Sequence, residues 1–358
     1  MTWLVGGASF LLAASLAPMV GALATRWGIV DHVKERGRKV HRRTTPLMGG
    51  VAVLVATIMT VLIVLIRSDL LTSGRVTTAH YVGLLLAGCV LMIGGVLDDK
   101  YNLSPKIQLL FPVAAALVAI AGGLGIEKIT NPFGGFVWFE TVTWNLFALG
   151  PHMVAVSWPG DVFVFLWLLG MMFTVKLLDG LDGLATSIGS VGVLMVLLLA
   201  GTTAYFQPDV VVLSAIILGA FLGFLVWNVH PAQLFLGEGG ALLVGFFLGA
   251  LAIISGGKIA TLLLVMGIPI LDVAWVMFRR LRSGKDVSKG DRLHLHHRLY
   301  DFGLSQRQVV GLYTLLALGF GSLTLVLPSF AKLIALVCLM FFTLIGAYAL
   351  LIVEGERR

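Results

Sequence analysis

Long apolar stretches separated by short polar segments run through almost the whole chain. Each stretch is roughly 20 residues long, which is the length of an α-helix that crosses a bilayer. The stretches lie near residues 2–25, 48–66, 79–97, 107–125, 161–178, 184–204, 210–227, 240–256, 259–278, 309–327 and 332–353. This pattern predicts an all-α polytopic membrane protein with about 11 transmembrane helices, folded as a single integral membrane domain over residues 1–358.

The composition excludes several other classes of protein. Hydrophobic residues make up 58% of the chain and charged residues only 12%, against roughly 25% charged residues in soluble domains. Disordered, collagen-like and nucleic-acid-binding proteins are therefore excluded. Cys89 and Cys338 both fall inside apolar stretches, so the chain offers neither a disulfide framework nor a zinc site.

Positive charge is distributed unevenly between the two predicted faces. If all eleven stretches cross the membrane, 20 of the 25 Lys and Arg residues fall on one face. The positive-inside rule makes this face cytoplasmic, with the N-terminus outside and the C-terminus in the cytoplasm. The largest outer segment, near 126–160, contains Gly134-Gly135 and an alternating stretch from Phe136 to Trp144. It predicts a turn with a short β-hairpin or an interfacial aromatic element.

Five carboxylates lie at the predicted cytoplasmic ends of the apolar stretches. They are Asp98, Asp99, Asp179, Asp182 and Glu238. An ionised carboxylate near hydrocarbon costs roughly 2.5–3.5 kcal/mol on insertion scales, so several at one depth need cations or a water-filled cavity. A single Asp at a helix end is usually a cap, but five at one level indicate a metal site. Oxygen ligands of this kind favour Mg²⁺, with Mn²⁺ as an alternative.

The spacing of these carboxylates suggests a division of roles. If helical geometry continues through the segment Asp179-Gly-Leu-Asp182, its two carboxylates share one face and can hold a ligand together. The adjacent Asp98 and Asp99 point about 100° apart, so they can act separately. The glycines of the Asp-Gly-Leu-Asp-Gly motif let backbone N–H groups approach a phosphate, and the helix that follows presents its positive dipole end.

Histidine and arginine are concentrated in the last cytoplasmic loop. The run reads Asp291-Arg-Leu-His294-Leu-His296-His297-Arg298-Leu299. Its side chains could ligate a transition metal. Because no cysteine is nearby and oxygen ligands are available elsewhere, we favour contacts to the oxygens of a pyrophosphate.

Two further polar features have plainer interpretations. The basic run 34–43, which includes His41, has two possible roles. It can fix the membrane topology and attract anionic lipid head groups, or it can contact the substrate directly. Asp272 lies inside the ninth stretch, where we expect a helix-packing hydrogen bond or an ion pair with Arg279 or Arg280. We therefore leave Asp272 out of the predicted site.

A carboxylate cluster ringed by basic side chains fits a phosphorylated substrate bound through a divalent cation. The sequence therefore predicts phosphoryl chemistry at the membrane surface, with a soluble nucleotide-linked donor and an acceptor that carries a hydrocarbon tail. The alternative from another class is a secondary transporter or ion channel. Its acidic residues should lie near the middle of the membrane on broken helices.

Four of these motifs resemble, in order, those of the polyprenyl-phosphate N-acetylhexosamine-1-phosphate transferase family. They are Asp98-Asp99, Asp179-Gly-Leu-Asp182-Gly-Leu-Ala, Phe235-Leu-Gly-Glu238-Gly-Gly and His294-Leu-His296-His297-Arg298. The similarity runs from Arg38-Lys39-Val40-His41 to Gln308. It implies transfer of a sugar 1-phosphate from a UDP-sugar to undecaprenyl or a similar polyprenyl phosphate in a bacterial inner membrane. Release of UMP and a requirement for Mg²⁺ are also implied.

The form of the histidine motif is similar to that of the WecA/TagO branch, which implies UDP-N-acetylglucosamine as the donor. The related MraY branch, which transfers phospho-N-acetylmuramoyl-pentapeptide, is the alternative. Dimerisation is common in the family, although no interface signature stands out in this sequence. The sequence does not indicate which envelope glycan, such as lipopolysaccharide or teichoic acid, receives the product.

The resemblance also implies roles for individual residues. Asp98 matches a carboxylate proposed to deprotonate the lipid phosphate, with Asp99 beside it for metal or substrate placement. Asp179 and Asp182 match paired aspartates associated with nucleotide and metal binding. The implied metal ligands are Glu238, Asp99 and Asp182. The basic residues expected to contact substrate are Lys100, Lys176, His294, His296, His297 and Arg298.

Three positions depart from the family pattern. Glu238 stands where the family generally has Asp, Lys176 where it often has Asn, and Leu47 where an Arg often precedes the Gly pair. The extra methylene of Glu238 moves its carboxylate by about one C–C bond, against the strict octahedral geometry of Mg²⁺. Lys176 brings a cation that could supply a phosphate contact. We expect these changes to affect sugar specificity and metal affinity.

Overall fold

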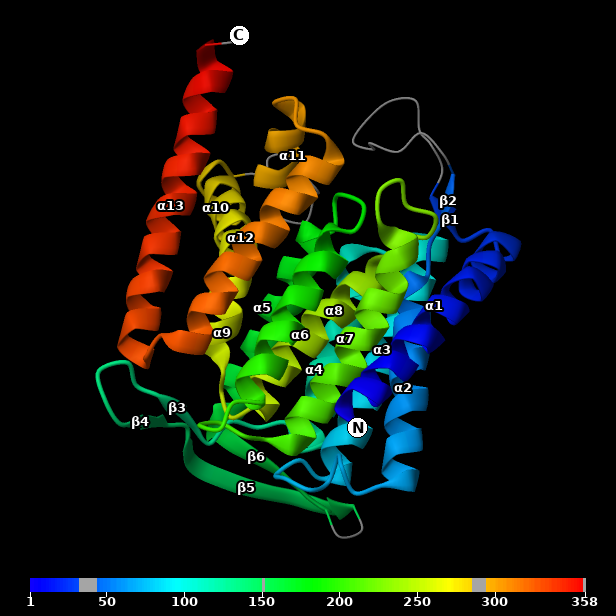
Figure 1. The fold of residues 1–358 in the computed structure, drawn as a ribbon, viewed down its shortest axis with the longest axis vertical. Helices are drawn as coiled ribbons and strands as arrows, with labels where there is room; N and C mark the ends of the chain where they lie inside the picture. The colour runs from blue at the N-terminus through cyan, green and yellow to red at the C-terminus, as the bar shows by residue number, and fades with distance from the viewer. Residues whose placement is uncertain (32–43, 150–151, 285–293, 357–358) are drawn as a thin grey trace.

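The computed structural model describes residues 1–31, 44–149, 152–284 and 294–356, in which the chain is mostly helical. Most of the helices run side by side in one bundle (Figure 1). They are α1 (Thr2–Arg26), α2 (Gly49–Arg67), α3 (Thr78–Tyr101), α4 (Pro105–Ala121), α5 (Gly160–Leu178), α6 (Leu184–Ala200), α7 (Pro208–Asn228), α8 (Glu238–Ile254), α9 (Ile259–Val265), α10 (Gly267–Arg282), α11 (Leu295–Asp301), α12 (Gln306–Val326) and α13 (Ser329–Glu356).

Within the described ranges, seven helices are long and apolar enough to cross a membrane. They are α1, α2, α3, α5, α7, α12 and α13. The α9 and α10 helices pass the same test as a pair bent by 75°, which gives up to eight spans. The apolar helices α4, α6 and α8 are shorter, with 17 residues each. A polytopic helical membrane protein is therefore confirmed, whereas the count of eleven crossings stays a prediction.

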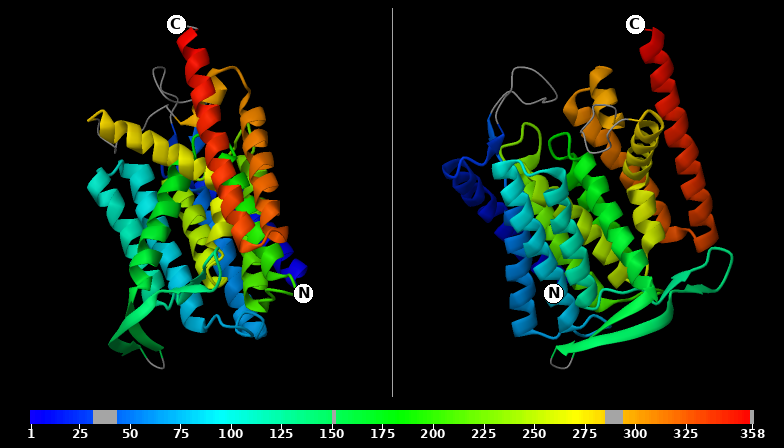
Figure 2. Two further views of the ribbon diagram at one scale, coloured as in Figure 1. Left: turned by 90° about the vertical axis from the view of Figure 1, so that its left-hand side faces the viewer. Right: turned by 180° about the vertical axis from the view of Figure 1, so that it is seen from behind.

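Six strands in the described part of the chain form three antiparallel pairs. They are β1 (Val30–Asp31) with β2 (Thr45–Pro46), β3 (Lys128–Thr130) with β4 (Phe136–Trp138), and β5 (Glu140–Leu149) with β6 (His152–Pro159). Strands β3 to β6 lie together at one end of the bundle, which we call the hairpin end, and α13 finishes at the opposite end (Figures 1 and 2). The predicted hairpin is thus present, but the segment forms two hairpins and the second is long.

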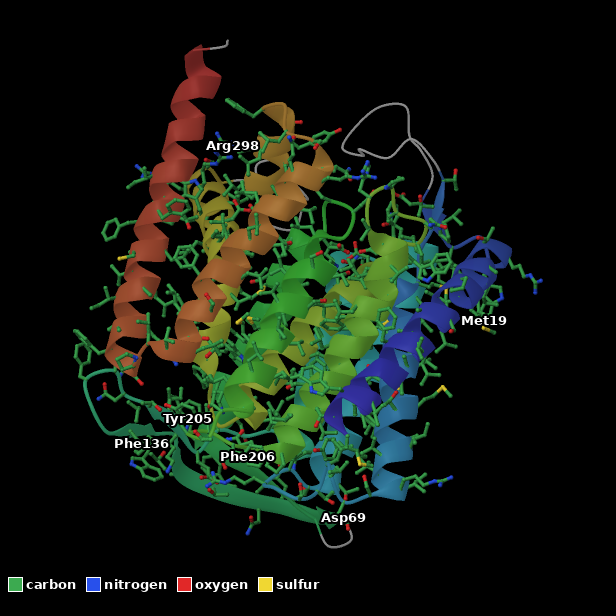
Figure 3. All side chains as sticks on the ribbon, in the orientation of Figure 1. Met19, Asp69, Phe136, Tyr205, Phe206 and Arg298 are labelled. Carbon is green, nitrogen blue, oxygen red and sulfur yellow. The ribbon has the colours of Figure 1, made fainter. Side chains whose placement is uncertain are left out.

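The hairpin end is rich in exposed aromatic side chains. Phe136 and Trp138 of β4 are both more than half exposed, and Lys128 lies over their rings, 4.5 and 4.9 Å from the ring centres. Phe136, Tyr205 and Phe206 all lie at this end in Figure 3. Aromatic rings beside cations are typical of the boundary between hydrocarbon and water, which agrees with the aromatic element predicted from the sequence.

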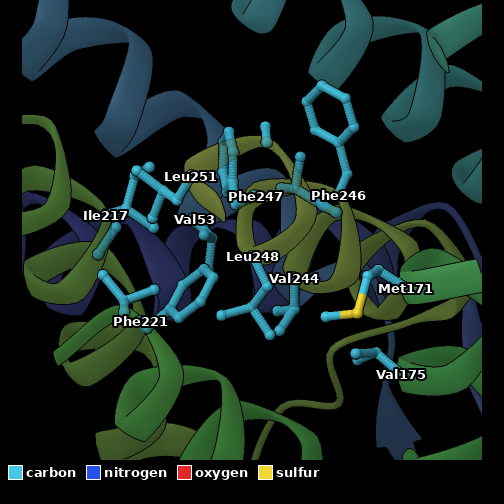
Figure 4. Packing of buried hydrophobic residues seen from close by; sticks show 14 of the residues in the cluster. Val53, Met171, Val175, Ile217, Phe221, Val244, Phe246, Phe247, Leu248 and Leu251 are labelled. Atoms are coloured by element: carbon cyan, nitrogen blue, oxygen red, sulfur yellow. The ribbon is translucent and has the colours of Figure 1, made fainter. Parts of the chain in front are cut away.

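Helix α8 forms the centre of the bundle. Every residue from Gly239 to Ile253 is buried, as expected for a helix that is hydrophobic on all sides. Figure 4 shows its side chains between Val53 of α2, Met171 of α5 and Phe221 of α7. This packing fixes the position of α8 relative to its neighbours.

Glycines allow α3 and α8 to approach closely near the start of α8. Gly95 of α3 faces Gly239 of α8, and a Cβ atom on either would collide with the backbone of the other. Small residues of this kind let helices pack at short range in a membrane. The contact brings the end of α3, which carries Asp99, next to Glu238.

Candidate active site

Three chain segments meet at the end of the bundle opposite the hairpin end: the end of α3, the loop between α5 and α6, and the start of α8 (Figure 1). They border a cavity of about 350 Å³. Its carboxylates are Asp31, Asp99, Asp179, Asp182 and Glu238. Four of the five carboxylates singled out from the sequence therefore share one cavity.

Asp99 reaches the cavity from α3 and is bound by the first turn of α8. Its Oδ1 accepts a hydrogen bond from the backbone N–H of Glu238, with an N···O distance of 3.1 Å. The preceding Gly237 has a φ of +79°, and a Cβ atom there would lie 2.6 Å from Asp99 Oδ2, so glycine suits both the turn and the contact. A carboxylate at a helix N-terminus is stabilised by the unpaired N–H groups and the helix dipole.

Asp98 has different partners from its neighbour, as the 100° turn per residue predicts. Its Oδ1 accepts hydrogen bonds from the backbone N–H of Leu103, at 2.8 Å, and from Nε2 of Gln108, at 2.9 Å. It stabilises the turn between α3 and α4 and is not among the residues that line the cavity. The structure therefore does not bring Asp98 onto the cavity wall with the other four carboxylates.

The loop between α5 and α6 carries Asp179 and Asp182 without helical geometry. Helix α5 ends just before Asp179, which has a ψ of +57°, and α6 begins only at Leu184. The motif therefore lies between the two helices, as the predicted stretches 161–178 and 184–204 leave it, and the condition of continued helical geometry is not met, because the motif's glycines favour a loop. Both carboxylates still face one cavity. Asp182 Oδ2 lies 2.7 Å from Nδ1 of His230 and accepts the N–H of Ala232 at 3.1 Å.

Negative charge is in excess around the cavity. Burial, together with the charges of Glu238, Asp182 and Asp99, raises the pKa of Asp179 to about 7. Among the described residues that line the cavity, Lys176 is the one cation against five carboxylates. Like charges gathered in a partly closed space are typical of sites that bind a cation.

Lys176 belongs to a polar network that joins four helices. Its Nζ lies 2.9 Å from Oε2 of Glu238 and donates to Oε1 of Gln108 at 3.1 Å. Gln108 Nε2 in turn donates to Asp98 Oδ1 and to the carbonyl oxygen of Leu103. The network therefore connects Asp98, which is off the cavity wall, with Glu238, which is on it.

Three residues of this region were missed by sequence reasoning: Asp31, Gln108 and His230. Asp31 and His230 are titratable groups at the predicted cytoplasmic ends of apolar stretches, so the criterion that selected the carboxylates could have found them. Gln108 carries no such signal, because a neutral amide near the start of an apolar stretch is unremarkable by itself.

The histidine motif lies against the loop between α5 and α6. A Cβ atom added to Gly180 would lie 2.6 Å from Nε2 of His296 and 2.8 Å from Nε2 of His297. His296 is fully buried, and burial together with the neighbouring His297 and His294 lowers its pKa well below the usual value. The ring of His296 is therefore neutral at pH 7, and it adjoins the loop that carries two of the cavity's carboxylates.

Asp272 holds the start of this motif. Its Oδ2 lies 2.9 Å from Nδ1 of His294, and its Oδ1 accepts the backbone N–H of Leu295 at 2.9 Å. Of the two interactions expected from the sequence, a packing hydrogen bond or an ion pair with Arg279 or Arg280, these contacts are of the first kind, and they are made to the beginning of α11. Because Nδ1 of His294 is used here, only Nε2 of that ring remains for another contact.

The other predicted substrate contacts lie outside the cavity lining. Lys100 is exposed, with its ammonium 5.3 Å from the centre of the Tyr101 ring. Arg298 is buried in α11, at the end of the bundle opposite the hairpin end (Figure 3). The basic run 34–43 and the pair Asp291-Arg292 fall outside the described residues. A role for these residues in binding stays a prediction.

The carboxylate oxygens of the cavity suit a hard divalent cation, although their side chains do not surround a single point. In the part of the chain that the structure describes, no group of three His, Cys, Asp or Glu side chains is close enough to surround a metal ion. Carboxylate oxygens in one cavity nevertheless have the chemistry that Mg²⁺ or Mn²⁺ prefers. Mg²⁺ in particular is usually held by one or two carboxylates, with water and substrate phosphate completing the ligands.

Comparison with known proteins gives a consistent picture. Residues 81–256 match the model of glycosyl transferase family 4. A probable undecaprenyl-phosphate N-acetylglucosaminyl 1-phosphate transferase of Bacillus subtilis is 29% identical over 327 residues, which cover 90% of this chain and 83% of that protein. A decaprenyl-phosphate N-acetylglucosaminephosphotransferase of Mycobacterium tuberculosis is 28% identical over 333 residues, covering 86% and 78%.

A phospho-N-acetylmuramoyl-pentapeptide-transferase of Desulforamulus reducens is 30% identical over 337 residues, which cover 88% of this chain and 92% of that protein. Fold, cavity and relatives together define a multi-pass membrane transferase. More specifically, the chain belongs to the polyprenyl-phosphate N-acetylhexosamine-1-phosphate transferase family, as its four motifs predicted. Two of the positions at which it departs from the family pattern, Lys176 and Glu238, contact each other directly.

Proposed function

We propose that the protein transfers N-acetylglucosamine 1-phosphate from UDP-N-acetylglucosamine to undecaprenyl phosphate or a similar polyprenyl phosphate, with release of UMP. The observation that carries this proposal is the single cavity shared by Asp99, Asp179, Asp182 and Glu238. The histidine motif against the same loop supports it. The printed names of the Bacillus and Mycobacterium relatives support this class of donor and acceptor.

We place the cavity at the cytoplasmic face of the bacterial plasma membrane, with eleven crossings and the N-terminus outside. Two observations support this orientation. Most Lys and Arg residues fall on the predicted cytoplasmic face, and α13 finishes at the same end of the bundle as the cavity (Figure 1). The acidic residues therefore lie near one surface, unlike the mid-membrane acids of a secondary transporter.

Mg²⁺, or Mn²⁺, would be held by Asp99, Asp182 and Glu238 together with oxygens of the donor. When bound, such an ion neutralises charge on the diphosphate. His296, His297 and Arg298 are the residues proposed to contact the diphosphate from α11. These contacts would orient the β-phosphorus toward the incoming lipid phosphate.

The proposed reaction is an in-line displacement. An oxygen of the lipid phosphate forms a bond to the β-phosphorus, and the bond from that phosphorus to the oxygen of UMP breaks. Positioning and charge neutralisation dominate such reactions, so no enzyme nucleophile is required. Asp98 is proposed to accept a proton from the lipid phosphate. Its Oδ1 already accepts two hydrogen bonds, so Oδ2 is the oxygen that would take the proton.

The test is a transfer assay with the purified full-length protein in nanodiscs, given UDP-N-acetylglucosamine, undecaprenyl phosphate and Mg²⁺. We expect one UMP for each lipid-linked sugar phosphate formed, loss of both products with a chelator, recovery with added Mg²⁺, and loss of turnover in Asp98→Asn. Movement of substrate across the nanodisc or liposome membrane without UMP would favour a transporter and overturn the proposal.

A second candidate is the transfer of phospho-N-acetylmuramoyl-pentapeptide. The Desulforamulus relative bears that name and is matched over 92% of its length. Equal concentrations of the two UDP-sugars, offered in parallel, separate the candidates. Preference for the pentapeptide donor would change the proposed identity of the donor, and the proposed class of reaction would stay the same.

A further inference from the structure

The cavity contains an ion pair whose two members line the same wall. The Lys176 ammonium lies 2.9 Å from Oε2 of Glu238, and the two side chains are 18% and 44% exposed. Solvent reaches the Glu238 side chain and screens the pair, and ion pairs screened in this way contribute little to stability. Lys176 and Glu238 can therefore each leave the other for a stronger partner at a small cost in free energy.

Lys176 is also anchored independently of Glu238. Its ammonium donates to Oε1 of Gln108 at 3.1 Å, and Gln108 is itself held by Asp98 and Leu103. An ammonium has three N–H donors, of which these two acceptors use two. Lys176 can therefore release Glu238 without losing its other anchor, and one donor remains for a ligand in the cavity.

The charges around the pair indicate what would exchange with it. Lys176 is the one cation among the described lining residues, and it touches Glu238, one of the five carboxylates of that lining. A divalent cation entering this space would compete directly with the ammonium for Glu238. A diphosphate entering with that cation would offer the displaced ammonium new oxygen acceptors.

We propose that Lys176 is a built-in counter-cation for Glu238 that exchanges partners during binding: Glu238 turns to the divalent cation, and Lys176 turns to a phosphate oxygen of the donor. This inference rests on the proposed function and adds a regulation to it. Lys176 opposes metal binding to the empty enzyme and supports binding of the metal together with the nucleotide sugar. Premature metal binding is thereby disfavoured.

The experiment measures Mn²⁺ binding to the full-length protein in nanodiscs by electron paramagnetic resonance, without nucleotide. In Lys176→Met we expect Mn²⁺ to bind about three- to tenfold more tightly, because Glu238 loses its competing cation. In the same variant we expect the KM for UDP-N-acetylglucosamine to rise at least about tenfold, because a charged phosphate contact is lost. The opposite signs of these two effects distinguish exchange from a merely structural role.

Two variants serve as controls. Lys106→Met removes the same charge from an exposed position on α4 that does not line the cavity, and we expect both constants to stay at the wild-type values. Lys176→Arg retains the cation, and we expect it to keep the weak Mn²⁺ binding of the wild type. If Lys176→Met fails to fold, Lys176→Gln, which removes the charge and keeps a polar side chain, replaces it in both measurements with the same two expected results.

Unchanged or weaker Mn²⁺ binding in a folded Lys176→Met would overturn the exchange, even if transfer activity is established. Conversely, tighter Mn²⁺ binding would support the competition even if neither UDP-sugar is a substrate, because this measurement needs no turnover. Failure of the inference and failure of the proposed function are thus distinguishable.

Discussion

The two ends of the bundle each contain a half-buried lysine, and the two are accommodated differently. At the hairpin end, Lys258 donates to the carbonyl oxygen of Ser255 at 2.7 Å and lies 5.5 Å from the centre of the Tyr205 ring. Burial and the nearby Lys332 lower the pKa of Lys258 to about 8. At the cavity end, Lys176 instead meets the carboxylate of Glu238. One lysine is solvated by neutral groups, and the other forms part of a charged site.

The aspartates of the two ends show the same contrast. Asp209, at the start of α7, is almost fully buried, and its two oxygens accept the backbone N–H groups of Val76 and Val210, both at 2.9 Å. Asp179 instead faces other carboxylates. Burial of a charge is therefore not what marks a functional site here. The mark is a group of carboxylates that line one cavity, with Lys176 as the one cation among the described residues of its lining.

The sharpest test of this contrast replaces one aspartate at each end. Asp99→Asn should lower kcat/KM by about 10²–10³-fold, because one charged partner of the reacting groups is lost, and should have little effect on thermal stability. Asp209→Asn should do the reverse: it should cost about 1–3 kcal/mol of unfolding free energy with the transfer rate preserved. Turnover assays and thermal unfolding on both variants measure this. Equal losses of activity in Asp99→Asn and Asp209→Asn would contradict the assignment of a functional role to the cavity end alone.

A smaller effect is expected from adding one methyl group at the cavity. Gly180 does not have a positive φ, so Gly180→Ala changes contacts without backbone strain, and its Cβ would press on His296. We expect kcat/KM for the donor to fall about 100-fold, as for a displacement near 1 Å. In Gly170→Ala, on α5, the new Cβ meets nothing within 4 Å, and full activity is expected. Wild-type kinetics in Gly180→Ala would show that the position of the histidine motif is unimportant.

The smallest effect concerns pH at the cavity end. Because the pKa of Asp179 is raised to about 7, this carboxyl is protonated below that pH and ionised above it. The negative charge of ionised Asp179 attracts a divalent cation held by the other carboxylates of the same cavity, so Mn²⁺ affinity should increase with pH and level off above 7, with a slope of at most about tenfold per pH unit below it. Mn²⁺ titrations at several pH values measure the slope. We expect a flatter profile in Asp179→Asn, and an unaltered slope would assign the proton to another group.

Some of the site could be predicted from the sequence because its chemistry conflicts with its surroundings. Asp99, Asp179, Asp182 and Glu238 stand out against apolar helices, and their common depth brings them to one cavity. The helix ends beside Asp179 and Asp182 were also predicted, because the apolar stretches 161–178 and 184–204 leave this motif between them. The backbone conformation within the motif was left open by the sequence, which allowed a continued helical turn, and the structure has a loop there.

Partners that are distant in the chain were also beyond prediction. The link between Asp272 and His294 depends on how α10 returns toward α11, and the role of Gln108 depends on α4 packing beside α5. Both are products of tertiary packing, whereas sequence patterns report on a single helix at a time. The number of crossings also depends on more than apolar length. The sequence predicted eleven crossings from that length, whereas α4, α6 and α8 are shorter than the seven helices that are long and apolar enough to cross a membrane.

The glycine contact between α3 and α8 has a consequence for redesign. Gly95 and Gly239 meet backbone to backbone, so the spacing between Asp99 and Glu238 is set by a helix crossing and not by adjustable side chains. An engineer who wants a different nucleotide sugar can reshape the walls of the cavity. A single methyl group at this crossing, on a residue that does not line the cavity, would move the two carboxylates apart.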